Sequence, residues 1–167
     1  MESRYEFDEV TVFSAHAMGV PGKRTFFVAL GDKDRWVRIW LEKTDLQAFA
    51  LSVNQLLLKV SRGQPLASSG TGLALSGADP ASGLPAAELE ADEITLGYED
   101  GKASMNVGAH AVGPQRQSRI ELECRPGLAQ LSVFAGHSLD VCAAGRPLCV
   151  LCGGPMDPGG HICPRNN

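Results

Sequence analysis

The C-terminal segment of the chain carries the sequence feature that most constrains its fold. Three cysteines and one histidine occur as Cys149-x-x-Cys152 and His161-x-Cys163, within fifteen residues. Tetrahedral zinc sites are built from thiolate and imidazole ligands at such short spacings. The sequence therefore predicts that these four residues bind one zinc ion.

The residues around the candidate ligands favour tight turns. Gly153 follows the second cysteine, where a glycine allows backbone amides to approach the sulfur atoms. The loop 153–160 contains four glycines and two prolines, so we expect it to turn back and bring His161 and Cys163 to the remaining coordination positions. Because four protein ligands leave no open position, the predicted zinc is structural.

Two alternatives to zinc are weaker. The chain has five cysteines, an odd number, and it begins without the hydrophobic segment of a signal peptide, so a disulfide or free thiols are less favoured. Iron in a similar knuckle would more usually take four cysteines. We expect Arg146 and Arg165 to screen the formal charge of about −1 on the zinc site.

A short tail requires a larger body to support it. We predict a folded domain over residues 1–147 and a zinc-binding tail over residues 148–167, because the tail is too short to bury a core of its own. Metal binding must supply most of its order. The apolar residues expected to dock the tail against the domain are Leu148, Leu151, Met156 and Ile162.

Length and charge exclude some classes of function. The 167 residues suffice for one ordinary domain plus the tail. A net charge of −4 argues against a general electrostatic attraction to nucleic acid. No apolar run reaches the roughly 18 residues of a membrane span. We therefore predict a cytoplasmic protein with no membrane partner.

The first half of the chain is expected to form strands and then a helix. Segments rich in β-branched and aromatic residues predict strands at 5–13, 25–30 and 36–41, with a loop at 15–22 and a hairpin between the last two strands. A capping box begins at Thr44, and apolar residues recur at helical spacing from Leu46 to Val60.

A segment of low complexity separates the two halves. Residues 63–87 are dominated by Gly, Ser, Ala, Pro and Leu, with Asp79 as the only charged residue. We predict a flexible insertion over residues 63–92, which ends in an acidic cluster. Strands are then expected at 93–98, 102–107 and 117–124, followed by a helix that begins near Pro126 and ends before Gly145.

The two halves share an order of elements. Arg38-Ile39-Trp40-Leu41-Glu42 precedes the first helix, and Arg119-Ile120-Glu121-Leu122-Glu123 precedes the second. We therefore predict an α+β domain of two β-β-β-α repeats. One antiparallel sheet would carry both helices on one face, with a short zinc-ribbon-like tail attached.

Two other groups of residues are candidate sites. Trp36, Arg38 and Trp40 share one face of the predicted hairpin. They could form a platform on which bases stack or a contact surface for a partner; the simpler interpretation is a sheet covered on both faces. A loop-built cleft near Gly19–Arg24 and His110 would make the protein an enzyme. No histidine has a Ser, Asp or Cys partner at a meaningful spacing.

Several motifs extend beyond the zinc tail: Thr25-Phe26-Phe27, Leu41-Glu42-Lys43, Ala143-Ala144-Gly145-Arg146-Pro147, and the tail through Cys163-Pro164-Arg165-Asn166. With these motifs the chain resembles an uncharacterised bacterial family, a domain of unknown function of the DUF3090 type. The resemblance spans most of the chain except residues 63–87, and the tail is its most specific part. Relatives commonly have proline where this chain has Val150. The resemblance implies the fold and the metal ligands, and it implies no reaction.

These observations favour one function over two alternatives. We predict a non-enzymatic, zinc-stabilised interaction or adaptor module that binds a protein partner. The first alternative is the enzyme with the loop-built cleft. The second is a nucleic-acid-binding protein that uses the zinc knuckle with Arg146 and Arg165, which the net charge disfavours.

Overall fold

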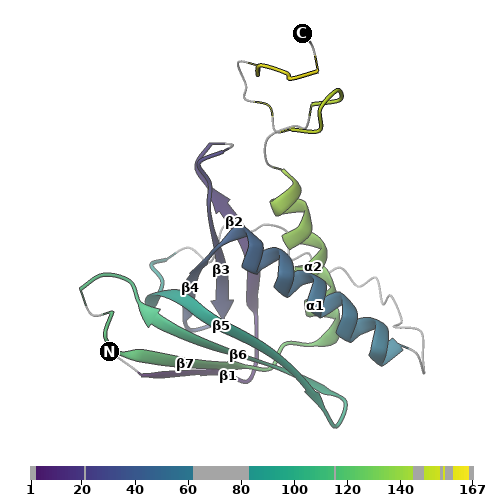
Figure 1. The fold of residues 1–167 in the computed structure, drawn as a ribbon. Coiled ribbons are helices and arrows are strands. Elements are labelled where there is room, and N and C mark those ends of the chain that lie inside the picture. The colour runs from purple at the N-terminus through teal and green to yellow at the C-terminus, as the bar shows by residue number, and fades with distance from the viewer. Residues whose placement is uncertain are drawn as a thin grey trace.

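The computed structural model describes residues 3–20, 22–61, 83–114, 116–144, 149–154, 156 and 160–165. Two helices and a seven-stranded sheet form an α+β body (Figure 1). In chain order the elements are β1 (Arg4–Phe7), β2 (Val12–Met18), β3 (Thr25–Gly31), β4 (Trp36–Leu41), α1 (Lys43–Ser61), β5 (Ala87–Glu99), β6 (Lys102–Ala111), β7 (Arg119–Cys124) and α2 (Leu128–Ala143). Neither helix, as far as the chain is described, is long and apolar enough to cross a membrane.

The strands form one mixed sheet in the order β1-β7-β6-β5-β4-β3-β2. Neighbouring strands are antiparallel except at two places: β4 with β5 and β1 with β7 run parallel. The prediction of a wholly antiparallel sheet was therefore wrong. β4 and β5 are joined by a long connection that contains α1 and not by a tight turn, and strands joined by such a crossover pair in parallel.

The N-terminal segment is divided between the two edges of the sheet. Residues 5–13, predicted as one strand, contribute to both β1 and β2, and β2 continues to Met18 through residues expected in a loop. β1 pairs with β7 at one edge and β2 with β3 at the other. The buried residues Tyr5, Phe7 and Phe13 give both strands the same apolar signal, so the break between them is not visible in the pattern.

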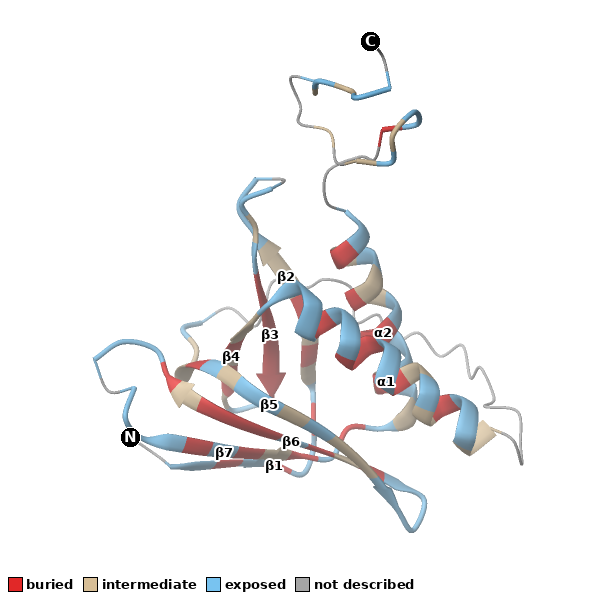
Figure 2. Cartoon of the chain, viewed as in Figure 1, coloured by how far each residue is buried: buried red, intermediate tan, exposed pale blue. Residues whose placement is uncertain are grey.

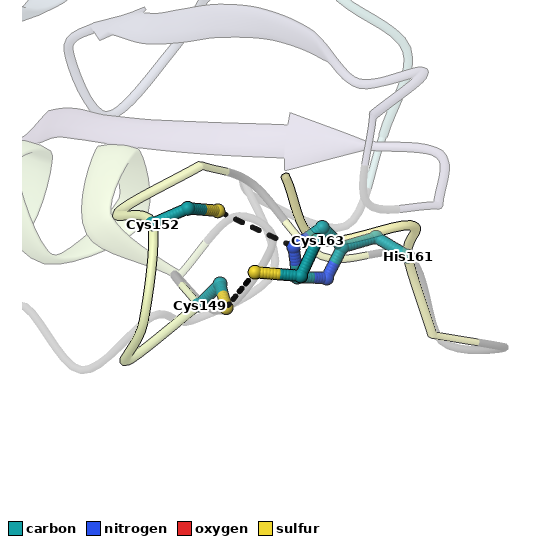
Figure 3. Close-up of side chains that lie close together, drawn as sticks. All are labelled: Cys149, Cys152, His161 and Cys163. Atoms are coloured by element: carbon teal, nitrogen blue, oxygen red, sulfur yellow. Dashed lines mark hydrogen bonds between the residues drawn. The ribbon is translucent and has the colours of Figure 1, made fainter. Parts of the chain in front are cut away.

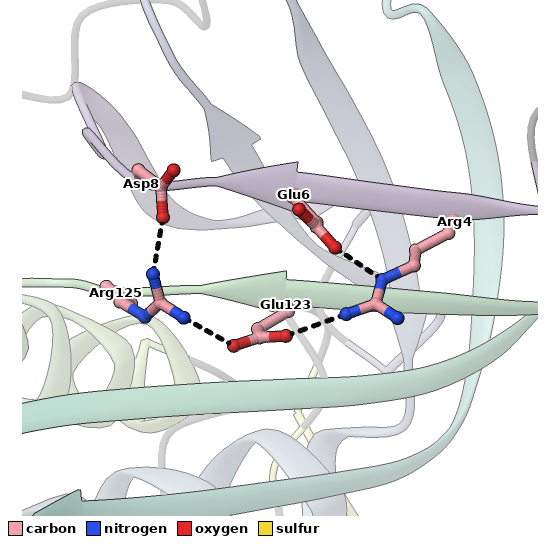
Figure 4. Close-up of polar contacts among 5 residues, drawn as sticks. All are labelled: Arg4, Glu6, Asp8, Glu123 and Arg125. Atoms are coloured by element: carbon pink, nitrogen blue, oxygen red, sulfur yellow. Dashed lines mark hydrogen bonds and ion pairs between the residues drawn. The ribbon is translucent and has the colours of Figure 1, made fainter.

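A network of charged side chains links β1 to β7 (Figure 4). Arg4 Nε lies 2.6 Å from Glu6 Oε1, and Arg4 Nη2 lies 3.1 Å from Glu123 Oε2. The other oxygen of Glu123 is 3.1 Å from Arg125 Nη2, and Arg125 Nη1 is 2.7 Å from Asp8 Oδ1. Exposed ion pairs contribute only about 0–1 kcal/mol each. The buried inner face of β1 therefore holds this edge more strongly than the charges do.

Both helices pack on one face of the sheet and enclose the main core (Figure 2). The ring of Phe134 in α2 stacks on Phe13 of β2, with centroids 4.0 Å apart, and meets Phe49 of α1 edge-on at 5.7 Å. Leu46 of α1 and Leu131 of α2 are fully buried. The predicted apolar stripes of both helices therefore face the sheet, as expected.

The second half of the body begins earlier than expected. β5 starts at Ala87, so residues 87–92 belong to a strand where we predicted flexible insertion, and residues 63–82 lie outside the described residues. Asp100 and Gly101 join β5 to β6 with φ of 51° and 78°, as a two-residue hairpin turn requires. After β1 the element order is three strands and a helix, twice. An internal repeat stays a prediction.

Substitution of Phe134 by alanine tests the importance of the core contact. The change leaves a cavity between the sheet and both helices, so we expect a loss of about 3–5 kcal/mol in the free energy of unfolding. Val133, its neighbour in α2, is 45% exposed, and Val133→Ala should change stability by only about 0.5 kcal/mol. Urea denaturation followed by circular dichroism measures both, and equal stabilities would contradict this account of the core.

Candidate metal centre

The four predicted ligands come together in the tail, beyond the C-terminal end of α2 (Figures 1 and 3). One donor atom from each of Cys149, Cys152, His161 and Cys163 lies within 4.8 Å of the others. Within the described part of the chain, this is the one cluster of three or more such side chains able to hold a metal ion. Residues separated by an eight-residue loop in the sequence thus meet at one point.

Two of the distances between donor atoms are close to those of a tetrahedral site. With Zn–S bonds of about 2.3 Å, a tetrahedron places two sulfurs about 3.8 Å apart and a sulfur and an imidazole nitrogen about 3.6 Å apart. The Sγ atoms of Cys149 and Cys163 are 3.9 Å apart, and Cys152 Sγ is 3.4 Å from His161 Nε2. All five cysteines are free thiols. The geometry therefore suits a metal ion and does not support the disulfide alternative.

The backbone around Cys149 forms a tight knuckle. Its carbonyl accepts a hydrogen bond from the Gly153 N–H at 2.9 Å, and its own N–H donates to the Gly154 carbonyl at 2.8 Å. Gly153 has φ of +70°, a conformation that side chains other than glycine rarely adopt. This backbone conformation explains the glycine that directly follows the second cysteine.

Backbone amides favour the thiolate of Cys149. Hydrogen bonds from the N–H groups of Cys152 and Leu151 lower the pKa of the Cys149 thiol. At Cys163 the Arg165 N–H also favours the thiolate, but burial and hydrogen bonds with Cys152 and Cys149 outweigh it and raise the pKa of Cys163. The thiolate is the metal-binding form. In the metal-free tail Cys149 is therefore the first of this pair to ionise.

The other two cysteines lie in the main core. Cys124 of β7 is 1% exposed and Cys142 of α2 is 4% exposed. Burial raises the pKa of Cys124 to about 12 and also raises that of Cys142. Both thiols are protonated at neutral pH, which is typical of small core residues and not of metal ligands.

Two of the apolar tail residues that we predicted to dock on the body are exposed instead. Ile162 is 94% exposed and Leu151 is 50% exposed, so the expectation was wrong for both. Met156 is half-buried, and Leu148 lies outside the described residues. The tail is held by its own ligands and turns, and metal coordination does not require these side chains to be buried.

Of the two arginines that we expected near the metal site, only Arg165 lies in the described part of the chain. Arg165 donates a hydrogen bond from Nη1 to the Leu151 carbonyl at 3.3 Å, which ties the end of the tail to the first knuckle. Arg146 lies outside the described residues. Arg165 therefore has a structural contact in addition to the screening role that we predicted for it.

The aromatic face of the hairpin is covered. Phe27 and Trp36 are each 5% exposed. The guanidinium of Arg38 lies over the rings of Phe27, Trp36 and Trp40, at 5.0, 5.6 and 5.7 Å from their centroids, and pairs with Glu88. Arg38 thus occupies the surface on which bases would have to stack. The simpler interpretation, a sheet covered on both faces, was wrong in that both helices lie on the other face; here the aromatic side chains and Arg38 cover one another instead.

A cleft of about 900 Å³ opens beside the N-terminal end of α1. Gly22 and Arg24 line it, as the enzyme hypothesis expected, but His110 does not and instead pairs with Asp92. No histidine lines the described part of the cleft, and its one thiol is the protonated Cys142. The structure therefore does not bring together the residues predicted for a catalytic cleft.

Alkylation with iodoacetamide should distinguish two groups of cysteines. In metal-loaded protein we expect slow reaction throughout, because the thiols are either bound or buried. After chelation Cys149, Cys152 and Cys163 should react quickly, while Cys124 and Cys142 should react only on unfolding. Mass spectrometry of the labelled peptides measures each site. Rapid labelling of Cys142 in folded protein would show that the grouping is wrong.

Comparison with known proteins supports the resemblance found in the sequence. A family model described as "Protein of unknown function (DUF3090)" matches residues 5–163, which include the body and all four ligand positions. No curated protein and no solved structure gives a significant match. The chain therefore belongs to the DUF3090 family.

Proposed function

We propose that this protein is a zinc-stabilised, non-enzymatic interaction module whose tail binds a protein partner. The observation that carries the proposal is the exposure of apolar side chains on both metal knuckles. Val150, between the first two cysteines, is 97% exposed, and Ile162, between His161 and Cys163, is 94% exposed. Exposed apolar groups that cluster at one place are typical of interaction sites.

Zinc is the metal that best fits this set of donors. Three thiolates and one imidazole complete a tetrahedron around zinc. Magnesium and calcium prefer oxygen ligands, and iron in such knuckles more usually has four cysteines. Since all four positions are filled by the protein, the ion has no place for a substrate and supports the structure of a zinc-ribbon-like tail.

The bound ion explains how a short tail displays apolar groups without collapsing around them. In the described tail only Cys149 is buried, so the tail has no apolar core. Coordination replaces hydrophobic burial as the source of order. Burial of an apolar side chain against a partner contributes roughly 1.5–3 kcal/mol. A reducing cytoplasm, where the thiols stay available for the metal, is the compartment we propose.

Metal analysis tests the zinc assignment. We expect about one zinc per chain in reduced, chelator-free protein. Cys152→Ser should lose the zinc, because it removes one of four ligands. Cys142→Ala is the matched control and should keep the zinc, since that thiol is buried in the core. Circular dichroism should show a folded body in both variants. Substantially less than stoichiometric zinc in the unmodified protein would rule the assignment out.

Affinity capture from the native host tests the interaction. We expect a partner retained by the unmodified protein to be lost with Cys152→Ser and with the double substitution Val150→Ser and Ile162→Ser. Leu58→Ser is the control, because Leu58 is 67% exposed on α1, away from the tail. Quantitative mass spectrometry compares the captured proteins. The same partners on all four baits would count against the proposed function.

A further inference from the structure

We infer that the tail and the turn between β2 and β3 form one surface, and that this surface binds a partner segment that is both apolar and acidic. The inference rests on the proposed interaction function and specifies the chemistry of the partner. It names a second element, the turn, that the metal motif does not include.

The turn and the tail lie at the same end of the molecule. Figure 1 shows both near the C-terminal end of α2, with the tail continuing beyond it. Five of the eleven large apolar residues that are exposed in the described chain lie in the tail, in this turn or at the last residue of β2. We call these five residues the tail-end surface: Met18 (51% exposed), Val20 (64%), Val150 (97%), Leu151 (50%) and Ile162 (94%).

Backbone contacts hold the turn in a defined shape beside α2. The Lys23 N–H donates to the Val20 carbonyl at 2.9 Å. Gly19 has φ of +99°, and a Cβ there would lie 2.4 Å from the Lys23 carbonyl oxygen, so the turn requires glycine. Arg24 Nη1 donates to the carbonyl of Val141 in α2 at 3.3 Å. The turn is therefore attached to the helix from which the tail departs.

The charge of this end differs from that of the whole chain. Residues 18–25 and 149–165 contain three basic residues, Lys23, Arg24 and Arg165, and one acidic residue, Asp157. With the formal charge of about −1 on the zinc site, this end carries about +1, whereas the chain carries a net charge of −4. Lys23 and Arg165 are exposed. An acidic segment is attracted to this end and repelled by the remaining surface, which directs where it binds.

The same residues favour a protein segment over nucleic acid. Five exposed apolar side chains with a few cations match an amphipathic helix that has an acidic polar face. Nucleic-acid binding depends on many phosphate contacts, and sequence-tolerant binding of single strands adds exposed aromatic rings. The covered aromatic face of β3 and β4 does not provide such rings.

Synthetic peptides test the chemistry of the partner. Two labelled peptides carry the same leucine stripe at helical spacing, one with glutamate and one with lysine at the polar positions, and a third scrambles the glutamate peptide. Fluorescence anisotropy with zinc-loaded full-length protein gives each Kd. We expect the glutamate peptide to bind at least about 10-fold more tightly than the other two.

Variants of the protein locate the surface. Val20→Ser in the turn and Ile162→Ser in the tail should each weaken binding of the glutamate peptide about 10-fold, and Arg165→Glu should remove the preference for glutamate over lysine. Leu58→Ser should bind as the unmodified protein does. Zinc content and circular dichroism verify that each variant is loaded and folded.

Three results would overturn the inference: equal Kd values for the glutamate and lysine peptides, unchanged binding by Val20→Ser, or tighter binding of an RNA or DNA oligonucleotide than of the glutamate peptide.

These results are distinguishable from failure of the proposed function. If capture of native partners depends on Ile162 while the peptides show no acidic preference, the interaction function stands and only the partner's chemistry is wrong. If capture does not depend on the tail, the function itself is wrong.

Discussion

The packing of Phe134 between the sheet and α1 holds α2 in position on the body. Its ring joins β2, α1 and α2 in one contact. On the same helix, Gln130 and His137 contact backbone carbonyls of Val10 and Ala15, so α2 also covers the open edge of the sheet at β2. A helix bound both to the core and to a strand edge has a fixed direction. The C-terminal end of α2 therefore lies beside the β2–β3 turn, where Arg24 contacts the Val141 carbonyl.

Two different sources of stability meet at the end of α2. The body is held by apolar burial, whereas the described tail contributes no residue to the main core and brings its ligands together instead. Structural zinc binding in small peptides is worth about 10–16 kcal/mol, comparable to the stability of a whole domain. Such a tail does not need to dock on the body in order to be ordered. Its apolar side chains are consequently available to another molecule.

Local signals predicted the elements well but not their partners. The strands predicted at 93–98, 102–107 and 117–124 coincide with β5, β6 and β7, and in β7 the buried Ile120, Leu122 and Cys124 alternate with less buried residues. Alternation specifies which face of a strand is buried, but it does not say which strand lies beside it. The two parallel pairs and the division of residues 5–13 between opposite edges depend on long-range contacts. The order strand, helix, strand around α1 could have predicted the parallel pair, because two strands joined through a helix commonly pair in parallel.

The metal centre, in contrast, could be predicted from the sequence, because its ligands lie close together in the chain and their spacing alone defines the site. The error there concerned Leu151 and Ile162, which we expected to be buried because they are apolar. That expectation assumes that apolar burial holds the chain in place. In a loop held by metal ligands the assumption fails, and an apolar side chain is free to face solvent. Its exposure is then compatible with folding, and it is the feature on which the proposed binding of a partner rests.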